Sequence, residues 1–208
     1  YSMLKNMLKK TTLASLLIGL LAQPIIGPAK ESLRLHLSGR DAENPVPWEF
    51  FCSAGRNSGM WTNLAVPSCW ELQGFGIFRY GHEDKTNAPI RGDYRHRFNV
   101  PADWRGQRVF IVFEGAMTDT VVKINGTQSG PMHQGAFYRF KHDITGLVKF
   151  GAENLLEASV TDRSANESVN AAERISDYWV FGGIFRPVWL QVEPLQFIDR
   201  VAIDARAF

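Results

Sequence analysis

Apolar residues in this chain recur with the two-residue period of β-strands rather than the longer period of helices. Residues 94–100 (YRHRFNV) place Tyr, His, Phe and Val on one face and polar residues on the other, which predicts a half-buried strand. Residues 108–114 (RVFIVFE) are apolar on both faces, as in a central strand of a sandwich. Further strands are predicted at 120–124, 136–140, 154–161 and 186–192. No convincing long helix is predicted.

Turn residues separate the predicted strands. Asn125-Gly126 follows the strand at 120–124, and this pair readily supplies the two positive φ angles of a tight hairpin. Short, closely spaced strands with turns between them predict an all-β fold, an antiparallel sandwich. Two long stretches, 67–93 and 162–178, lie outside the predicted strands. Long loops of compact domains often carry function. Both could lie at one end of the sandwich, but the sequence does not place them.

The N-terminal pattern predicts a secretory signal peptide over residues 1–29. Lysines at 5, 9 and 10 precede a short apolar run, Leu13–Ala22, and small residues follow it, with cleavage expected after Ala22 or Ala29. The run is too short to span a bilayer comfortably, so no membrane partner is expected; a short buried helix is the alternative. No cysteine directly follows the run, so a lipid anchor is not indicated. We therefore expect a periplasmic or secreted protein.

Composition and charge narrow the function classes. The formal net charge is +2 and the basic residues are scattered, which gives no argument for a nucleic-acid partner. Aromatic residues make up 12% of the chain, which suits a β-rich core and equally a surface on which sugar rings stack. The composition alone does not decide between these two uses.

The two cysteines and five histidines give no metal-ligand spacing, so neither a structural zinc nor any cofactor is predicted. Cys52 and Cys69 could form a disulfide in an oxidising compartment. A domain of this size does not need one, and the sequence cannot supply the geometry. The pairing stays open at this point.

Five segments, taken in order, resemble the N-terminal sugar-binding domain of family 2 glycoside hydrolases, the β-galactosidase and β-glucuronidase family. They are residues 66–76 (VPSCWELQGFG), 92–115 (GDYRHRFNVPADWRGQRVFIVFEG), 121–135 (VVKINGTQSGPMHQG), 143–160 (DITGLVKFGAENLLEASV) and 177–192 (DYWVFGGIFRPVWLQV). Any one of these segments would be weak evidence for the resemblance, because hairpin turns and apolar strands are common. The resemblance implies a jelly-roll β-sandwich like that of galactose-binding domains, over residues 30–194. It also implies that residues 195–208 begin an immunoglobulin-like domain, cut short.

In that family a TIM barrel carries the two catalytic glutamates. Such a barrel takes about 250 residues, so a chain of 208 cannot hold it beside the sandwich. Glu71, Glu114, Glu173 and Asp177 are candidates for catalysis only because they are acidic. The resemblance therefore implies no catalytic residue in this chain, and a catalytic barrel of the parent chain as its partner.

The resemblance assigns sugar binding to Asp177. In the family, an aspartate two residues before the aromatic of this motif reaches into the barrel's active site and binds the terminal sugar. In some members it also helps to bind sodium, a role not carried over because its other ligands lie in the barrel. Trp179 is the second substrate-binding candidate. The alternative for Asp177 is a turn cap or an ion pair with Arg174 or Arg186. Trp70 is expected to pack at the sandwich edge, with stacking on sugar as its alternative.

Three hypotheses remain from the sequence. The first is an accessory sugar-binding domain of an exported exo-glycosidase, which supports the barrel and completes its glycone pocket. The second is a self-sufficient carbohydrate-binding module, which requires a platform of exposed aromatic residues. The third is a purely structural or partner-binding sandwich.

Overall fold

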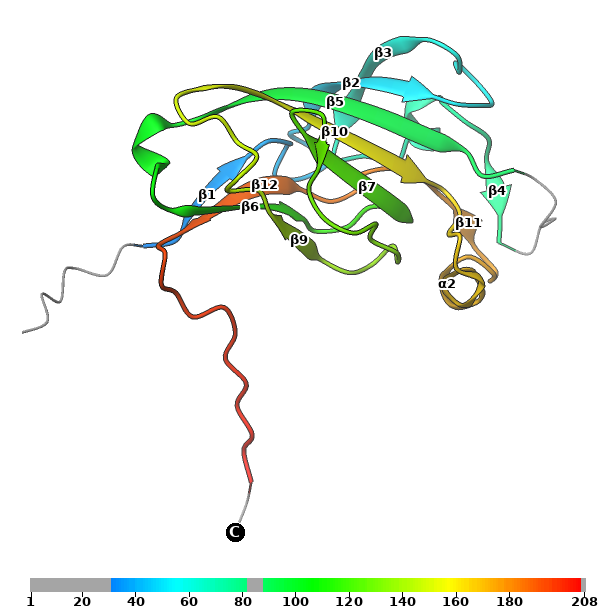
Figure 1. The fold of residues 1–208 in the computed structure, drawn as a ribbon. Helices are drawn as coiled ribbons and strands as arrows, with labels where there is room; N and C mark the ends of the chain where they lie inside the picture. Colours follow the sequence, from blue (N-terminus) through cyan, green and yellow to red (C-terminus); the bar gives the residue numbers. More distant parts are fainter. Residues whose placement is uncertain (1–30, 82–87, 207–208) are drawn as a thin grey trace, which may run out of the picture. The chain divides into compact units, whose positions relative to one another are not determined.

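The computed structural model describes residues 31–81 and 88–206 (Figure 1). The chain divides into two units, residues 1–30 and 31–208, and only the second is described. The predicted signal peptide at residues 1–29 lies outside the described residues and stays a prediction.

Two antiparallel sheets pack face to face in the described unit (Figure 1). The four-stranded sheet has the order β1 (Leu33–His36), β12 (Val188–Glu193), β6 (Arg108–Phe113), β9 (Phe140–Asp143). The six-stranded sheet has the order β3 (Trp61–Val66), β2 (Val46–Cys52), β5 (Arg91–Val100), β10 (Ala152–Thr161), β7 (Asp119–Ile124), β8 (Thr127–Gln128). This arrangement confirms the predicted antiparallel jelly-roll β-sandwich.

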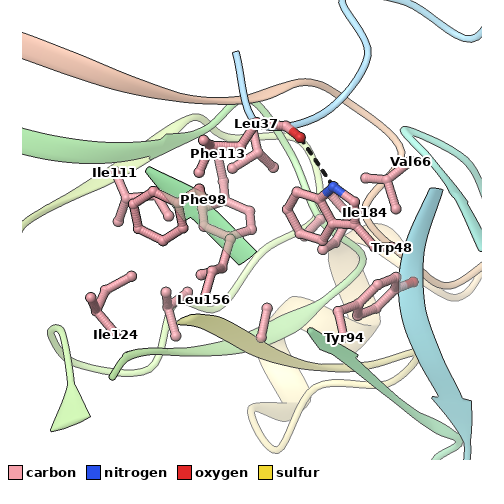
Figure 2. Packing of buried hydrophobic residues seen from close by; sticks show 14 of the residues in the cluster. Leu37, Trp48, Val66, Tyr94, Phe98, Ile111, Phe113, Ile124, Leu156 and Ile184 are labelled. Atoms are coloured by element: carbon pink, nitrogen blue, oxygen red, sulfur yellow. Dashed lines mark hydrogen bonds between the residues drawn. The ribbon is translucent and has the colours of Figure 1, made fainter. Parts of the chain in front are cut away.

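The core lies between the sheets because the strands alternate in the predicted way. Tyr94, Phe98 and Val100 of β5 are buried, whereas Arg97 and Asn99 between them are exposed. Both sheets contribute large buried side chains, drawn in Figure 2: Trp48, Tyr94, Phe98, Ile111, Phe113, Ile124 and Leu156. Each fully buried side chain of this size contributes about 1.5–3 kcal/mol of hydrophobic free energy.

One polar contact crosses this core. The indole nitrogen of Trp48 donates a hydrogen bond of 3.1 Å to the carbonyl oxygen of Leu37 (Figure 2). The bond satisfies the one polar atom of a side chain that is 1% exposed, and therefore removes the cost of burying it.

Several predicted strands are found with small shifts, and the hairpin is confirmed. Asn125 and Gly126 have φ values of 52° and 82° and connect β7 to β8. Val188 begins β12 directly after Pro187, which has no N–H group to donate to a ladder.

One predicted strand, residues 136–140, is wrong. Only Phe140 belongs to a strand, β9, because the backbone N–H of Ala136 donates to the carboxylate of Glu173 at 2.7 Å instead of to a neighbouring strand. Phe137 and Tyr138 between them are exposed. Strands β1, β2 and β3 were not predicted from the sequence.

The two long stretches outside the predicted strands contain short elements. The first holds the 3-10 helix η1 (Glu71–Gln73) and β4 (Arg79–Tyr80), and the second holds α2 (Glu167–Glu173) and ends directly before β11 (Trp179–Val180). A second 3-10 helix, η2 (Ala102–Trp104), follows β5. Asn166 caps α2 by accepting a hydrogen bond from the N–H of Ser168.

The segment after β12 contains no strand in residues 194–206. Phe197 nevertheless packs against Phe110 of β6, with ring centroids 5.8 Å apart, and Asp199 pairs with Lys141 at 2.5 Å. That residues 195–208 begin an immunoglobulin-like domain stays a prediction.

Candidate functional site

A two-stranded ribbon joins the two long stretches and creates the candidate site. β4 pairs antiparallel with β11, so that Tyr80 lies opposite Trp179 and Arg79 lies opposite Val180. The pairing brings together residues almost a hundred positions apart, and Figure 1 shows the ribbon near the ends of β5 and β10. The two long stretches therefore lie close together, a position that the sequence analysis left open.

Aromatic side chains cluster on this ribbon. The ring of Trp179 contacts Tyr80 and Phe78 edge to face, with centroid separations of 5.4 and 6.0 Å. Phe78 in turn contacts Phe181 at 6.2 Å, and the guanidinium of Arg56 lies over its ring at 4.8 Å. Trp179 remains 53% exposed and Phe78 42% exposed. Together these rings form an apolar surface that is partly exposed to solvent.

Asp177 lies exposed beside this aromatic surface. Its carboxylate accepts a hydrogen bond from the hydroxyl of Tyr80. That bond raises the pKa of the Tyr80 hydroxyl above its ordinary value of 10. The described residues include no ion pair of Asp177 with Arg174 or Arg186, which was one of the two alternatives for this aspartate, the other being a turn cap.

The two arginines make other contacts. Arg174 is buried, and its guanidinium donates to the carbonyl oxygens of Asp162 and Phe181. Arg186 donates to the carbonyl of Phe137 at 3.3 Å. The Asp177 carboxylate thus keeps acceptor capacity for a ligand beyond its bond to Tyr80.

A buried carboxyl group supports the ribbon from inside. Glu71 of η1 is 2% exposed, and its two carboxylate oxygens accept the N–H of Gly182 at 3.1 and 3.0 Å. Burial raises the pKa of Glu71 to about 7, and the charge of Asp162 adds to this effect. Glu71 therefore ties the first long stretch to the backbone that leads from β11 into β12.

Asp162 and Arg79 form a second support. Their side chains make an ion pair of 3.3 Å, and the carboxylate of Asp162 also accepts the N–H of Ile90 at 2.8 Å. Burial raises the pKa of Asp162, against the opposing effect of Arg79. Because Arg79 belongs to β4, this pair anchors the strand that carries Tyr80.

Trp70 packs in the core beneath the same backbone. It is 0% exposed, so the structure contradicts the alternative in which it stacks on a sugar. A Cβ atom on Gly182 would lie 2.1 Å from the ring of Trp70, and one on Gly92 would lie 2.6 Å from it. Glycine is required at both positions because the indole occupies that space.

The acidic residues considered for catalysis are bound to other groups. Glu173 accepts the N–H of Ala136, and Glu114 forms an ion pair of 2.5 Å with Arg139. Glu71 is bound to Gly182 and Asp177 to Tyr80. Each carboxylate thus has a local partner that accounts for its place in the fold.

Metal and disulfide sites are not found in the described part of the chain. Its His, Cys, Asp and Glu side chains form no group of three or more that could hold a metal ion. Cys52 and Cys69 are both free thiols, so the open question of a disulfide is answered against pairing in this structure. Within the same residues, no helix is long and apolar enough to cross a membrane.

The structure adds two residues to the predicted site. Of the two sequence candidates, Trp179 lies in β11 and Asp177 lies two residues before it. They meet Tyr80 of β4 and Phe78, which directly precedes β4. Neither was a sequence candidate, because β4 is two residues long and carries no periodicity. The cluster of aromatics in residues 67–93 was the only available signal.

Comparison with known proteins identifies the relatives of this fold. Residues 41–194 match the family model described as the sugar binding domain of glycosyl hydrolases family 2. A β-glucuronidase of Bacteroides fragilis is 33% identical over 162 residues, covering 77% of this chain and 22% of that protein. A β-galactosidase of Thermoanaerobacter pseudethanolicus is 38% identical over 100 residues, covering 48% of this chain and 13% of that protein.

Solved structures agree at the level of the fold. The crystal structure of a putative β-galactosidase from Bacteroides fragilis superposes with a TM-score of 0.58 at 24% identity, over 79% of this chain and 24% of that one. A β-glucuronidase of Bacteroides uniformis superposes with a TM-score of 0.57 at 22% identity, over 79% of this chain and 18% of that one. The chain thus spans a quarter or less of the length of these relatives.

Proposed function

We infer the function from the premise that this chain belongs to family 2 of the glycosyl hydrolases, as its sugar-binding domain over residues 41–194. We propose that it is the accessory domain of an exported exo-glycosidase of the β-galactosidase and β-glucuronidase type. In this role it supports a catalytic barrel elsewhere in the parent chain and contributes Asp177 to the pocket for the terminal sugar. Export is proposed from the signal-peptide pattern of residues 1–29 alone.

One observation carries the proposal: the β4–β11 ribbon presents a carboxylate next to exposed aromatic rings. Asp177 can accept hydrogen bonds from two sugar hydroxyls, and such charge-assisted bonds are stronger than neutral ones. The Tyr80 hydroxyl orients the carboxylate, and Trp179 offers an apolar face for the C–H groups of a sugar ring. Buried Glu71 and the Asp162–Arg79 pair hold the ribbon in place.

An accessory role is favoured over independent catalysis. Glycoside cleavage needs two carboxyl groups roughly 5–10 Å apart with one of them held protonated. Among the described residues, Glu71 has a carboxyl pKa of about 7, but it is 2% exposed and bound to the backbone, where no substrate reaches it. Hydrolysis is therefore assigned to the proposed parent enzyme and not to this segment.

The test is the substitution Asp177→Asn in the full parent enzyme, assayed on p-nitrophenyl β-galactoside and β-glucuronide. Loss of one charge-assisted hydrogen bond to substrate is expected to lower kcat/KM by about 10- to 100-fold. Tyr80→Phe, which removes only the group that orients the carboxylate, is expected to lower kcat/KM less. Asp103→Asn is the matched control, because Asp103 is an exposed aspartate in η2.

Equal activity of Asp177→Asn and Asp103→Asn would refute the pocket contribution. A parent reading frame without any barrel-sized region would refute the accessory role as a whole. In that case the self-sufficient carbohydrate-binding module takes its place, because the exposed ring of Trp179 is the platform that such a module requires. That module predicts measurable sugar affinity of the isolated chain, which Trp179→Ala abolishes.

A further inference from the structure

A hollow lies on the outer face of the six-stranded sheet, away from the core. Its volume is about 230 Å³, and its walls are formed mainly by Trp61, Asp93, Arg95, Lys123, Glu157 and Ser159. None of these residues belongs to the β4–β11 ribbon. The hollow therefore needs an explanation that the proposed function does not supply.

The strand register produces this arrangement. Arg95 of β5 lies opposite Glu157 of β10, and Glu157 lies opposite Lys123 of β7, so three charges of alternating sign follow one row across the sheet. In the adjacent row on the same face, Asp93 lies opposite Ser159. Directly opposite residues in a sheet point to the same side, so all five side chains project outward together.

An aromatic wall closes one side of the hollow. Trp61 of β3 is 43% exposed, and the guanidinium of Arg95 lies 4.1 Å from the centre of its ring. Phe51 of β2, directly opposite Trp61 in the register, packs against it with ring centroids 5.8 Å apart. These two neighbours fix the indole in position while leaving part of it open to a ligand.

The charges in the hollow balance, which disfavours an ionic ligand. Arg95 and Glu157 form an ion pair of 3.4 Å, and Asp93 forms an ion pair of 3.0 Å with Arg91 beside the hollow and accepts the hydroxyl of Ser159 at 2.6 Å. Lys123 makes no ion pair within the described residues. With two acidic and two basic groups in the walls, the formal charge of the lining is zero, so the lining gives no argument for an ionic ligand.

A neutral polyhydroxyl ring matches these groups. Each hydroxyl both donates and accepts hydrogen bonds, and the walls offer carboxylates as acceptors and an ammonium, a guanidinium and a hydroxyl as donors. The exposed indole of Trp61 suits the C–H face of such a ring. Pockets for drug-sized ligands hold roughly 300–1,000 Å³, so a hollow of about 230 Å³ suits one sugar ring rather than several.

We propose that this outer-face hollow is a second carbohydrate site, which binds one neutral pyranose unit of an oligosaccharide between Trp61 and the Arg95–Glu157–Lys123 row. The site anchors a glycan on the sheet and carries out no chemistry. It does not depend on the proposed function, because it shares no residue with the ribbon that carries Asp177 and Trp179.

The test is a titration of the whole 208-residue chain, labelled with ¹⁵N, with cellotetraose and galactotetraose. We expect saturable shifts of the Trp61 indole N–H signal, assigned with Trp61→Phe, and of backbone amides in β5, β7 and β10. Trp61→Ala is expected to weaken binding at least tenfold. Arg97→Gln is the control, because Arg97 lies on the same face of β5 two residues from Arg95 and outside the hollow.

Four results would overturn the proposal. The first is the absence of saturable shifts with either neutral tetrasaccharide, and the second is binding that survives Trp61→Ala unchanged. The third is a set of shifts that map only to residues 78–80 and 177–179, which places the sugar on the ribbon. The fourth is binding of tetragalacturonate in preference to the neutral sugars, which shows an anion site instead. Folding of each variant is checked by its amide spectrum.

Discussion

The buried carboxyl group of Glu71 makes the stability of this domain depend on pH in a way that can be isolated. Its pKa is raised from 4.5 to about 7, chiefly by burial. At about 1.4 kcal/mol for each pH unit, the difference corresponds to about 3 kcal/mol. Because the folded state holds the proton to higher pH than the unfolded state, this contribution is fully present below pH 4.5 and is lost as the pH rises through about 7.

The perturbation is Glu71→Gln, which keeps an acceptor for the N–H of Gly182 but cannot ionise. We expect the free energy of unfolding of the variant, minus that of the wild type, to rise by about 3 kcal/mol between pH 4.5 and 7.5. Any fixed free-energy cost of packing the amide at this position adds a constant to this difference and leaves its pH dependence unchanged. The assay is urea unfolding followed by tryptophan fluorescence at half-unit pH steps.

The difference between the two proteins is the informative quantity, because other groups also titrate in this range. Burial lowers the pKa values of His96 and His142, which makes the wild type more stable as the pH rises toward neutrality. The raised pKa of Asp162 acts in the opposite direction. The histidine contributions are common to both proteins and cancel, whereas the repulsion between Asp162 and Glu71 is lost in the variant and forms part of the measured effect. A difference that stays flat or falls between pH 4.5 and 7.5 would refute the assignment of a protonated, buried Glu71.

Two further substitutions test a close packing contact and a pair of hydrogen bonds. Gly182→Ala should lower the free energy of unfolding by about 3 kcal/mol, because the added Cβ would lie 2.1 Å from the ring of Trp70. Gly146→Ala is the control and should be nearly neutral, because a Cβ there has nothing within 4 Å. Equal urea midpoints of the two variants would contradict this expectation. Asn125→Gly should lower the free energy of unfolding by about 2 kcal/mol in the same assay. Glycine keeps the positive φ but loses the hydrogen bonds of 2.9 and 2.8 Å that the Asn125 amide donates to Leu147 and the buried Asn154. An unchanged midpoint would show that these hydrogen bonds do not stabilise the fold.

Local patterns account for the parts of the fold that the sequence predicts. The alternation in β5 and the apolar run of β6 each fit within one strand, and the hairpin at Asn125-Gly126 depends only on the φ preferences of two residues. By contrast, β2 (VPWEFFC) contains a proline and two adjacent phenylalanines, so its alternation is obscured. Its position is fixed by pairing with β3 and β5, which no local pattern reveals.

The residues of the candidate site also divide into those that the sequence predicts and those that only distant contacts bring into place. Asp177 and Trp179 were found from the sequence because a resemblance pointed to a continuous segment. Tyr80 and Phe78 were not, since they reach Asp177 and Trp179 only through the β4–β11 pairing, a contact between distant parts of the chain. The buried Glu71 was indistinguishable from a solvated acid, because its role depends on the N–H of Gly182, 111 residues away.

The order of strands in the four-stranded sheet sets a condition on how this domain can fold. The last strand, β12, lies between β1 and β6, so the first strand has no neighbour in its sheet until residues 188–193 arrive. Pairing β1 with β12 closes a loop of about 150 residues, and contacts so distant in sequence make folding slow, on the millisecond-to-second scale. During synthesis, the edges of β1 and β6 that pair with β12 therefore stay unpaired until the ribosome has completed β12, and unpaired strand edges make such an incomplete domain prone to aggregation.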